Sequence, residues 1–227
     1  MTLALLYDIH GNLPALEAVL SDAEAAGARR FVLGGDYAAF GAWPRETVER
    51  LKELDAEWIR GNVDRWTVDP EEAPWPVRPA LGICRELLGE DLAAKLAALP
   101  PTLAHEGVLY CHGSPRSDVD GFMPEPAEGE EELLAGVDGG RLVFGHTHLQ
   151  FTRTAANGVE LVNPGSVGLP LDGDHRAAYA LVADDGAIEL RRVAYDHAAS
   201  AAAVRERLGE AGEVPARRIE QARFDVG

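Results

Sequence analysis

The sequence predicts an α/β protein that forms a single domain over residues 1–227 and contains two β-sheets. Apolar runs alternate with helical patterns over the first 60 residues, and such alternation with short links predicts parallel strands joined by right-handed crossovers. Four short apolar runs after residue 150 are joined by turn-type links, which predicts a second, antiparallel sheet. A length of 227 residues is sufficient for one good-sized core.

The first half of the chain supplies the parallel strands, which we expect at residues 3–7, 31–33 and 57–60. A helix is expected between the first two strands, with Asn12 as its N-cap, Pro14 in its first turn and Gly27 after its end. Leucine and valine recur there with the 3.6-residue period of an amphipathic helix. A second helix is expected over residues 44–54.

The second half is more varied. Residues 65–79 are rich in proline, tryptophan and acidic side chains and predict an irregular loop. The remaining expected elements are helices at 80–88 and 91–99, a hairpin at 102–106 and 108–111, a long loop at 114–130, a buried strand at 141–144, strands at 151–155, 159–162, 178–182 and 188–193, and a helix at 197–208. Loops as long as 114–130 are usually functional or disordered. The last residues carry little predictive information.

The composition excludes several classes of protein. The formal net charge is −17, so binding of long nucleic acids is disfavoured. No apolar run approaches the roughly 20 residues that span a membrane, and a strand begins too early for a cleavable signal. Cys84 and Cys111 are too few for a disulfide framework and lack a metal-type spacing, so we expect reduced thiols in a cytoplasmic protein.

Side chains that can bind metal ions follow five of the predicted strands, at the point where each strand ends. They are Asp8, His10, Asp36, Asn62, His112, His146 and His148. The carboxyl ends of strands in an open α/β sheet form its ligand crevice, and residues i and i+2 of an extended segment point to the same side. One histidine at a strand end is ordinary, but seven such side chains in equivalent positions predict a metal centre.

The ligand types narrow the choice of metal. Imidazole together with carboxylate and amide oxygens suits Mn, Fe, Zn, Co or Ni better than Ca or Mg. Seven ligands are too many for one such ion. Two ions about 3.5–4 Å apart, bridged by a carboxylate, would accommodate them.

These motifs resemble the full signature of the calcineurin-like metallophosphoesterases, in particular their small bacterial and archaeal branch of phosphodiesterases and diadenosine-polyphosphatase-like enzymes. The matching segments are Asp8-x-His10, Gly35-Asp36, Gly61-Asn62, His112 and Gly145-His146-x-His148, followed by a site-flanking turn at Asn163-Pro164-Gly165-Ser166. The resemblance implies a four-layer α/β fold in which two mixed sheets form a sandwich flanked by helices. It also implies a dinuclear centre, which we expect to contain manganese.

The resemblance also assigns roles. One metal would bind Asp8, His10 and His148, the second would bind Asn62, His112 and His146, and Asp36 would bridge them. A metal-bound hydroxide would attack phosphorus in line while both ions neutralise the phosphoryl oxygens. The residues expected to take part in catalysis are Asp36, Asn62, Asp64 and His112.

The sequence departs from the family at one informative position. Many members have histidine directly after the asparagine, where it is thought to protonate the leaving group, whereas this chain has Val63 followed by Asp64. Valine cannot donate a proton, and general acid catalysis typically contributes 10²–10⁴-fold. We therefore expect leaving groups that depart unprotonated, in phosphodiesters or phosphoanhydrides such as dinucleoside polyphosphates, and expect Asp64 to orient its neighbours.

Other candidate residues carry weaker signals. Arg116 and Asn12 are candidate substrate-binding residues, Arg176 is an alternative phosphate clamp, and His105 and His175 are candidate replacement acids. Aromatic side chains that could border the site, or simply pack in loops, are Trp43, Trp66, Trp75 and Phe122.

Three alternative functions remain open at this stage. A non-catalytic scaffold of the same fold would resemble the retromer subunit, but every ligand position is filled here. A protein or monoester phosphatase is possible in principle, although the chain lacks obvious length for extra recognition elements. A nuclease of the same superfamily is disfavoured by the acidic composition.

Overall fold

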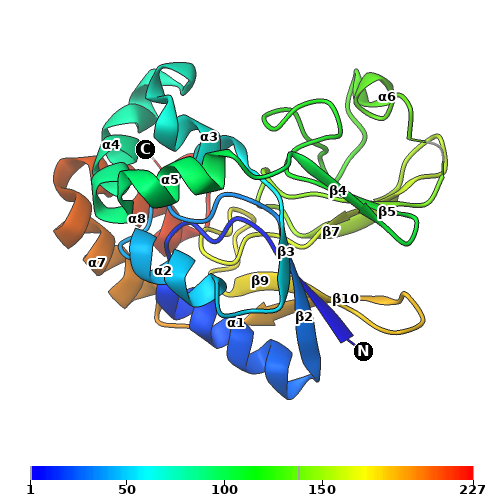
Figure 1. Cartoon of the computed structure of the whole chain (residues 1–227), viewed down its shortest axis with the longest axis horizontal. Helices are drawn as coiled ribbons and strands as arrows, with labels where there is room; N and C mark the ends of the chain where they lie inside the picture. The colour runs from blue at the N-terminus through cyan, green and yellow to red at the C-terminus, as the bar shows by residue number, and fades with distance from the viewer. Residues whose placement is uncertain (1, 138, 227) are drawn as a thin grey trace.

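The computed structural model describes residues 2–137 and 139–226, which contain two five-stranded mixed sheets flanked by helices (Figure 1). The first sheet has the order β10-β9-β1-β2-β3 and the second has the order β4-β5-β6-β8-β7. The strands are β1 (Thr2–Leu6), β2 (Ala28–Leu33), β3 (Ala56–Trp58), β4 (Thr102–His105), β5 (Val108–Cys111), β6 (Arg141–Val143), β7 (Phe151–Thr154), β8 (Glu160–Asn163), β9 (Ala177–Val182) and β10 (Ile188–Val193).

The pairing confirms the mixed sheets that the family resemblance implied. Strands β1, β2 and β3 are parallel, whereas β9 pairs antiparallel with β1, and β10 pairs antiparallel with β9. In the second sheet β5, β6 and β8 are parallel, and β4 and β7 form antiparallel edges. The prediction that the last four strands form their own antiparallel sheet is therefore wrong, because β7 and β8 join one sheet and β9 and β10 the other.

The two sheets pack face to face through alternating side chains of their central strands. On β1, Leu5 and the following Tyr7 belong to a buried cluster that also contains Val143 of the second sheet. Ala4 and Leu6 point the other way and belong to the cluster that packs against α1. This alternation is the period of two that a strand buried on both faces requires.

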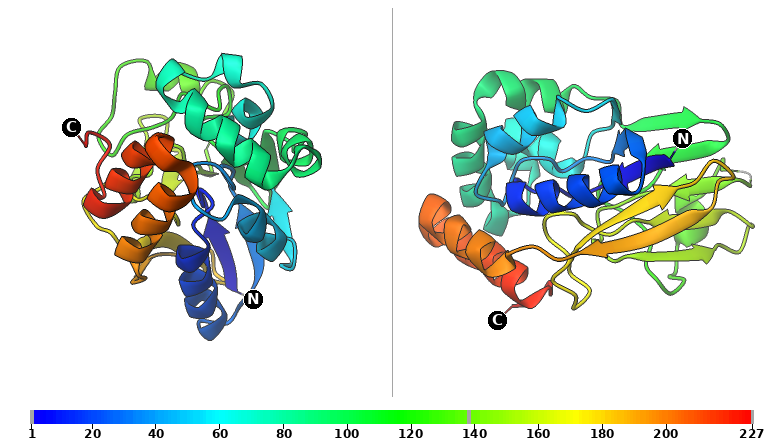
Figure 2. Two further views of the ribbon diagram at one scale, coloured as in Figure 1. Left: turned by 90° about the vertical axis from the view of Figure 1, so that its left-hand side faces the viewer. Right: turned by 90° about the horizontal axis from the view of Figure 1, so that it is seen from below.

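The helices lie mainly at one end and one face of the sandwich (Figures 1 and 2). They are α1 (Leu13–Ala25), α2 (Pro44–Leu51), α3 (Asn62–Val68), α4 (Arg78–Leu88), α5 (Glu90–Ala97), α6 (Glu130–Leu133), α7 (His197–Leu208) and α8 (Glu213–Gln221). Asn12 caps α1, and its side chain accepts a hydrogen bond from the Ala15 N–H at 3.4 Å, as predicted. The carboxylate of Asp22 on α1 accepts hydrogen bonds from Arg191 at 2.9 and 3.0 Å, which joins this helix to β10.

One further prediction of local structure is wrong, and one segment without a prediction forms a helix. Residues 65–79 are not an irregular loop throughout: the end of α3 and two short 3₁₀ helices, Pro70–Glu72 and Trp75–Val77, lie within them. Their prolines stand in the first turns of the 3₁₀ helices, where a missing N–H costs nothing. The tail beyond Leu208 forms α8, which packs against α7.

Neither cysteine forms a disulfide, and both Cys84 and Cys111 are buried. Within the described ranges, no helix is long and apolar enough to cross a membrane.

Candidate metal and phosphate site

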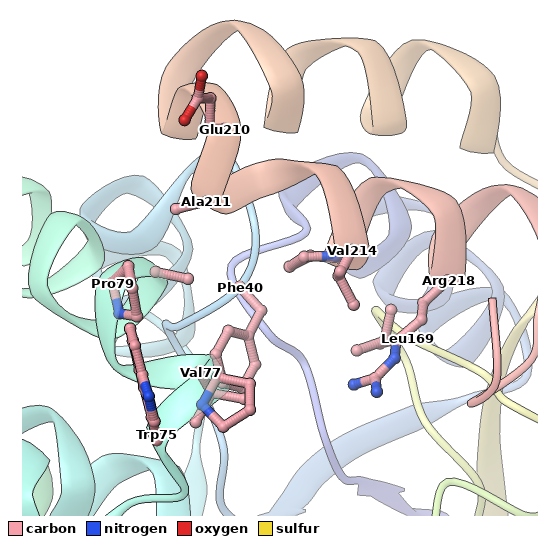
Figure 3. Close-up of a pocket in the computed structure, with 12 residues that line it drawn as sticks. Phe40, Trp75, Val77, Pro79, Leu169, Glu210, Ala211, Val214 and Arg218 are labelled. Atoms are coloured by element: carbon pink, nitrogen blue, oxygen red, sulfur yellow. The ribbon is translucent and has the colours of Figure 1, made fainter. Parts of the chain in front are cut away.

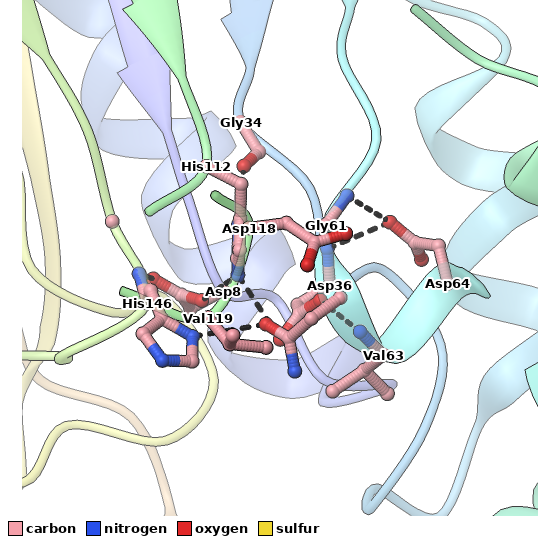
Figure 4. Close-up of polar contacts among 12 residues, drawn as sticks. Asp8, Gly34, Asp36, Gly61, Val63, Asp64, His112, Asp118, Val119 and His146 are labelled. Atoms are coloured by element: carbon pink, nitrogen blue, oxygen red, sulfur yellow. Dashed lines mark hydrogen bonds and ion pairs between the residues drawn. The ribbon is translucent and has the colours of Figure 1, made fainter. Parts of the chain in front are cut away.

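The seven predicted ligand side chains converge at the carboxyl ends of the parallel strands. Figure 4 shows four of them, Asp8, Asp36, His112 and His146. Five of them adopt a left-handed backbone conformation, with φ between 49° and 65°. They are Asp8, His10, Asp36, His146 and His148, and among the described residues only three other non-glycine residues have positive φ. Non-glycine residues in this conformation tend to cluster at functional sites.

Glycines precede several of these ligands because the backbone there touches a carboxylate. A Cβ atom on Gly61 would lie 2.1 Å from Oδ1 of Asp36, and one on Gly145 would lie 2.5 Å from Oδ2 of Asp8. Any larger residue would displace the carboxylate. The glycines of the sequence motifs therefore set the positions of the neighbouring ligands.

One group of ligand atoms consists of Asp8, His10 and His148. Their ligand atoms all lie within 4.8 Å of one another. Oδ1 of Asp8 is 3.4 Å from Nε2 of His148, and it is buried without a hydrogen-bond partner. Oδ2 of the same carboxylate accepts the backbone N–H of His146 at 3.0 Å.

A second group surrounds Asp36. Its Oδ2 lies 3.4 Å from Nε2 of His112 and 3.8 Å from Nε2 of His10, so this carboxylate faces both groups. Its Oδ1 accepts the backbone N–H of Val63 at 2.9 Å. Asp8 also faces both groups, because its Oδ1 is 3.8 Å from Nε2 of His112. From the sequence, only Asp36 was expected to lie between the two groups.

The Asn62 amide lies between His112 of the second group and His146. Its Oδ1 lies 2.9 Å from Nδ1 of His146, and in the reversed amide orientation the NH₂ group donates to both His146 and His112. A cation among these atoms requires the oxygen, whereas without a cation the NH₂ group is the better partner for two imidazole nitrogens. A metal ion at this position would therefore favour the orientation with Oδ1 toward His146.

The main chain fixes the tautomers of three rings. Nδ1 of His10, His112 and His148 lies between 2.6 and 3.1 Å from a backbone carbonyl oxygen. The three carbonyl groups belong to Ala39, Gly34 and Leu169 respectively. Because a carbonyl only accepts, Nδ1 carries the proton and each neutral ring keeps the lone pair of Nε2 for the site, which is how metal-binding histidines are usually held.

The closest pair of rings requires a positive charge between them. Nε2 of His10 and Nε2 of His148 are 3.1 Å apart, so two neutral rings in these tautomers would oppose their lone pairs. Burial and the neighbouring His148 lower the pKa of His10 to about 4. Burial opposes charge on His148 as well, but Asp8 outweighs it and raises that pKa. A proton or a divalent transition metal fits this position, and the carboxylate, imidazole and amide donors suit such a metal.

The charge on the second group is balanced differently. Burial opposes charge on His112, but Asp36 and Asp8 outweigh it and raise the pKa of His112 to about 10. In turn, burial would raise the pKa of Asp36, but the same histidine holds it below its usual value. The buried carboxylates of Asp8 and Asp36 therefore favour a positive charge between them, on His112 or on a bound cation.

Asp64 orients the loops that carry the ligands. Its carboxylate accepts backbone N–H groups of Asp36, Tyr37 and Gly61 at 2.9, 3.1 and 2.9 Å (Figure 4). Burial and the nearby Asp36 raise the pKa of Asp64 to about 7, against these three donors. Asp64 therefore ties the ends of β2 and β3 together, the positioning role expected from sequence.

The segment Asn163-Pro164-Gly165-Ser166 connects the two sheets beneath the ligands. The Asn163 side chain donates to the Gly145 carbonyl at 3.1 Å and to the Thr147 hydroxyl at 2.9 Å. The Ser166 hydroxyl donates to the backbone carbonyl of Asp8 at 2.7 Å. One turn thus holds the loops that present Asp8 and the two histidines of the Gly-His-Thr-His segment.

The ligand cluster opens into a cavity of about 700 Å³, which we call the metal-ligand cavity. Val63 lines it, so the valine at the family's histidine position does face the site. Trp66 also lines it, as does Arg218 of α8. Arg218 was not expected from the sequence, because nothing in the spacing of the C-terminal residues connects them with the strand ends.

The other candidates lie elsewhere. Asn12 is buried, and its amide is used in hydrogen bonds to Gly168, Tyr195, Ala15 and Ser200, which leaves no group for a substrate. Arg116 is exposed and donates to the Glu132 carbonyl at 3.3 Å. Six other candidates do not line the metal-ligand cavity. Among the charged and histidine candidates, Arg176 pairs with Asp174, His105 lies on β4, and His175 stacks on His197. Among the aromatic candidates, Trp43 packs among the helices, Trp75 is exposed, and Phe122 is buried under the second sheet.

Comparisons with known proteins agree with this geometry. A family model described as the calcineurin-like phosphoesterase superfamily domain matches residues 1–186. The chain is 29% identical over 219 residues to an uncharacterized protein of Methanocaldococcus jannaschii, covering 86% of this chain and 88% of that protein. It is 30% identical over 203 residues to the phosphodiesterase YfcE of Escherichia coli K12, covering 82% and 89%. A solved metallophosphoesterase from Sphaerobacter thermophilus superposes with a TM-score of 0.80 at 28% identity, covering 98% of this chain and 99% of that chain.

Proposed function

The chain belongs to the calcineurin-like phosphoesterase superfamily, and we propose that it uses two divalent metal ions to hydrolyse phosphodiester or phosphoanhydride bonds in small, nucleotide-like substrates. Its family and its similarity to a phosphodiesterase make it a hydrolase of phosphate esters. The single observation that carries the finer proposal is the cluster of seven ligand side chains, five of which line the same cavity as Val63 while Asp8 and His112 lie against them.

The proposed metal sites follow the two groups of ligand atoms. Asp8, His10 and His148 would hold one ion, and Asp36 would lie between it and the second. Asn62, His112 and His146 would complete the second site. We propose manganese, although this donor set also suits Fe, Zn, Co and Ni. When bound, such ions lower the pKa of water and offset the charge that develops on phosphoryl oxygens.

The protein's own residues would orient these groups. The backbone carbonyls keep three Nε2 lone pairs directed at the cluster, and Asp64 fixes the backbone beside Asp36. Arg218 supplies a fixed positive charge on the cavity wall. We therefore assign the substrate phosphate to the space between the ligand cluster and Arg218.

The choice of diesters and anhydrides over alkyl monoesters rests on the absence of a free acid. Among the described residues that line the metal-ligand cavity, the histidines are His10, His146 and His148, all of them proposed ligands. Val63 cannot protonate an alkoxide. Substrates whose leaving group is a nucleoside phosphate or an aryl oxide do not need that proton.

The test is hydrolysis of diadenosine tetraphosphate by the manganese-loaded protein, with products separated by anion exchange. Two ADP molecules would indicate symmetric cleavage, and ATP plus AMP would indicate attack at a different phosphorus. Bis-p-nitrophenyl phosphate and glycerol phosphate complete the panel, with His148→Ala as the inactive control. Fast turnover of glycerol phosphate with little on either other substrate would refute the proposal. Bound metal without hydrolysis of any phosphate ester would favour a scaffold.

A further inference from the structure

A second cavity of about 560 Å³, which we call the side cavity, adjoins the metal-ligand cavity (Figure 3). Five residues line both cavities: Phe40, Pro76, Val77, Leu169 and Arg218. The two cavities therefore meet along these five side chains, and we refer to the two together as the depression. A substrate whose phosphate sits at the ligand cluster lies beside the side cavity.

The side cavity is lined mainly by apolar side chains, with Glu210 and Arg218 as the charged residues on its wall. Trp75 and Val214, which line the side cavity, are 72% and 51% exposed, and Phe224 and Met123, which line the metal-ligand cavity, are 61% and 44% exposed. These are four of the seven large apolar side chains that are exposed in the described residues. Apolar surface gathered around one depression indicates a binding site for an apolar group.

Arg218 lies where the two cavities meet, and is the one lysine or arginine among the described residues that line them. Its Nε donates to the Phe224 carbonyl at 3.0 Å, and its guanidinium lies 4.1 Å from the centroid of the Phe224 ring. Within residues 2–137 and 139–226, no carboxylate forms an ion pair with it. In a chain of net charge −17, a half-buried arginine without such a partner is suited to an anionic ligand.

One wall of the side cavity comes from the C-terminal part of the chain. Ala211, Val214 and Arg218 belong to the segment of α7 and α8, beyond the residues 1–186 that match the family model. Figure 3 shows this wall facing Trp75 and Val77 from the opposite side of the cavity. The feature is therefore additional to the family's metal-binding motifs.

We propose that the side cavity binds an aromatic ester group of the substrate, against Trp75 and Val77, while Arg218 contacts a phosphate oxygen. This inference rests on the function proposed above and narrows its substrate class to diesters that carry an aromatic group on the side that does not leave. Aromatic rings stack well on tryptophan without needing polar partners.

The test uses phosphodiesters that share a p-nitrophenyl leaving group and differ only in the second ester group: methyl, phenyl and 1-naphthyl. The leaving group is constant, and the cavity variants described below separate binding of the second group from its electronic effect on phosphorus. We expect kcat/KM of the manganese-loaded enzyme to rise at least about tenfold from methyl to 1-naphthyl, in line with the apolar area that a naphthyl ring can bury.

Two tryptophan variants locate the effect. Val214→Trp fills the side cavity and should abolish the preference for the naphthyl ester. Val68→Trp is the matched control, since Val68 is also an exposed valine but lines neither cavity, and it should keep the preference. Loss of the preference in both variants, or in neither, would overturn the assignment to the side cavity.

A binding measurement without turnover is independent of the metal chemistry. In EDTA, 1-naphthyl methyl phosphate should quench tryptophan emission saturably, and Trp75→Phe should lose most of that change. Equal kcat/KM for the three esters would refute the aromatic pocket while leaving the proposed hydrolysis intact. Hydrolysis of none of them would refute the proposed function, and the pocket with it. A dimer in solution that Val214→Trp dissociates would assign this surface to a second copy instead.

Discussion

Replacing Val63 with histidine should extend the enzyme to poor leaving groups. Val63 lines the metal-ligand cavity and is 4% exposed, and its backbone N–H donates to Asp36 at 2.9 Å. An imidazole at this position would therefore enter the cavity directly beside the cluster. In its protonated form it could donate to a leaving oxygen, which valine cannot do.

The expected rate increase depends on how well the new imidazole is oriented toward the leaving group. General acid catalysis contributes about 10²–10⁴-fold when the acid is well oriented. Asp64, the nearest carboxylate in sequence, is already engaged by three backbone N–H groups and is not free to orient the ring. We therefore expect the lower end, about 100-fold, for an alkyl leaving group, and less than about threefold for p-nitrophenolate, which leaves unprotonated.

The assay compares kcat/KM across aryl and alkyl diesters whose leaving groups span a wide range of pKa. Val63→His should flatten the dependence of log kcat/KM on the pKa of the leaving group. Val63→Phe is the control, because it adds a ring of similar size without a proton to donate. An unchanged slope in Val63→His, with manganese content equal to that of the unmodified protein, would refute the explanation of the missing acid. Flattening in Val63→Phe as well would refute it equally.

Three further outcomes test other parts of the structure. Asp22→Asn should lower the free energy of unfolding by about 1 kcal/mol at pH 7, because the partly exposed ion pair with Arg191 is lost. Arg191 holds the pKa of Asp22 below its usual 3.8, so the ion pair stabilises the fold above pH 3.8. The difference between the two proteins in urea unfolding should therefore shrink as the pH falls below 3.8. Burial raises the pKa of Cys84 to about 11, so a disulfide reagent at pH 8 should modify it only in urea, and rapid modification of the native protein would contradict its burial. Gly61→Ala should weaken manganese binding at least about tenfold by displacing Asp36, and unchanged affinity by calorimetry would count against the close contact there.

The ligand set is predictable from sequence because it obeys a local rule. Each ligand lies within four residues of the end of an apolar run, and the carboxyl ends of parallel strands lie at one edge of a sheet. The hairpin of β4 and β5 and the helix α1 are similarly local, with capping and turn residues beside them. These elements needed no knowledge of distant partners.

Strand partners and the cavity wall were not predictable in this way. The apolar runs of β9 and β10 look the same whether they pair with β7 and β8 or with β1, because alternation records burial and not the neighbour. Arg218 reaches the metal-ligand cavity only because α8 folds back on α7, a contact with no counterpart in the spacing of nearby residues. The use of Asn12 inside the fold likewise depends on Gly168, 156 residues away.

The most direct test of the account is the number of manganese ions that the protein binds. Metal-free protein and its His148→Ala variant would be dialysed to equilibrium against manganese, and bound metal measured by mass spectrometry. The two groups of ligands predict two ions per chain in the unmodified protein and about one in the variant, which loses a ligand from the Asp8 and His10 group alone. Binding of less than one ion per chain, or equal binding by both proteins, would contradict a dinuclear centre at these strand ends.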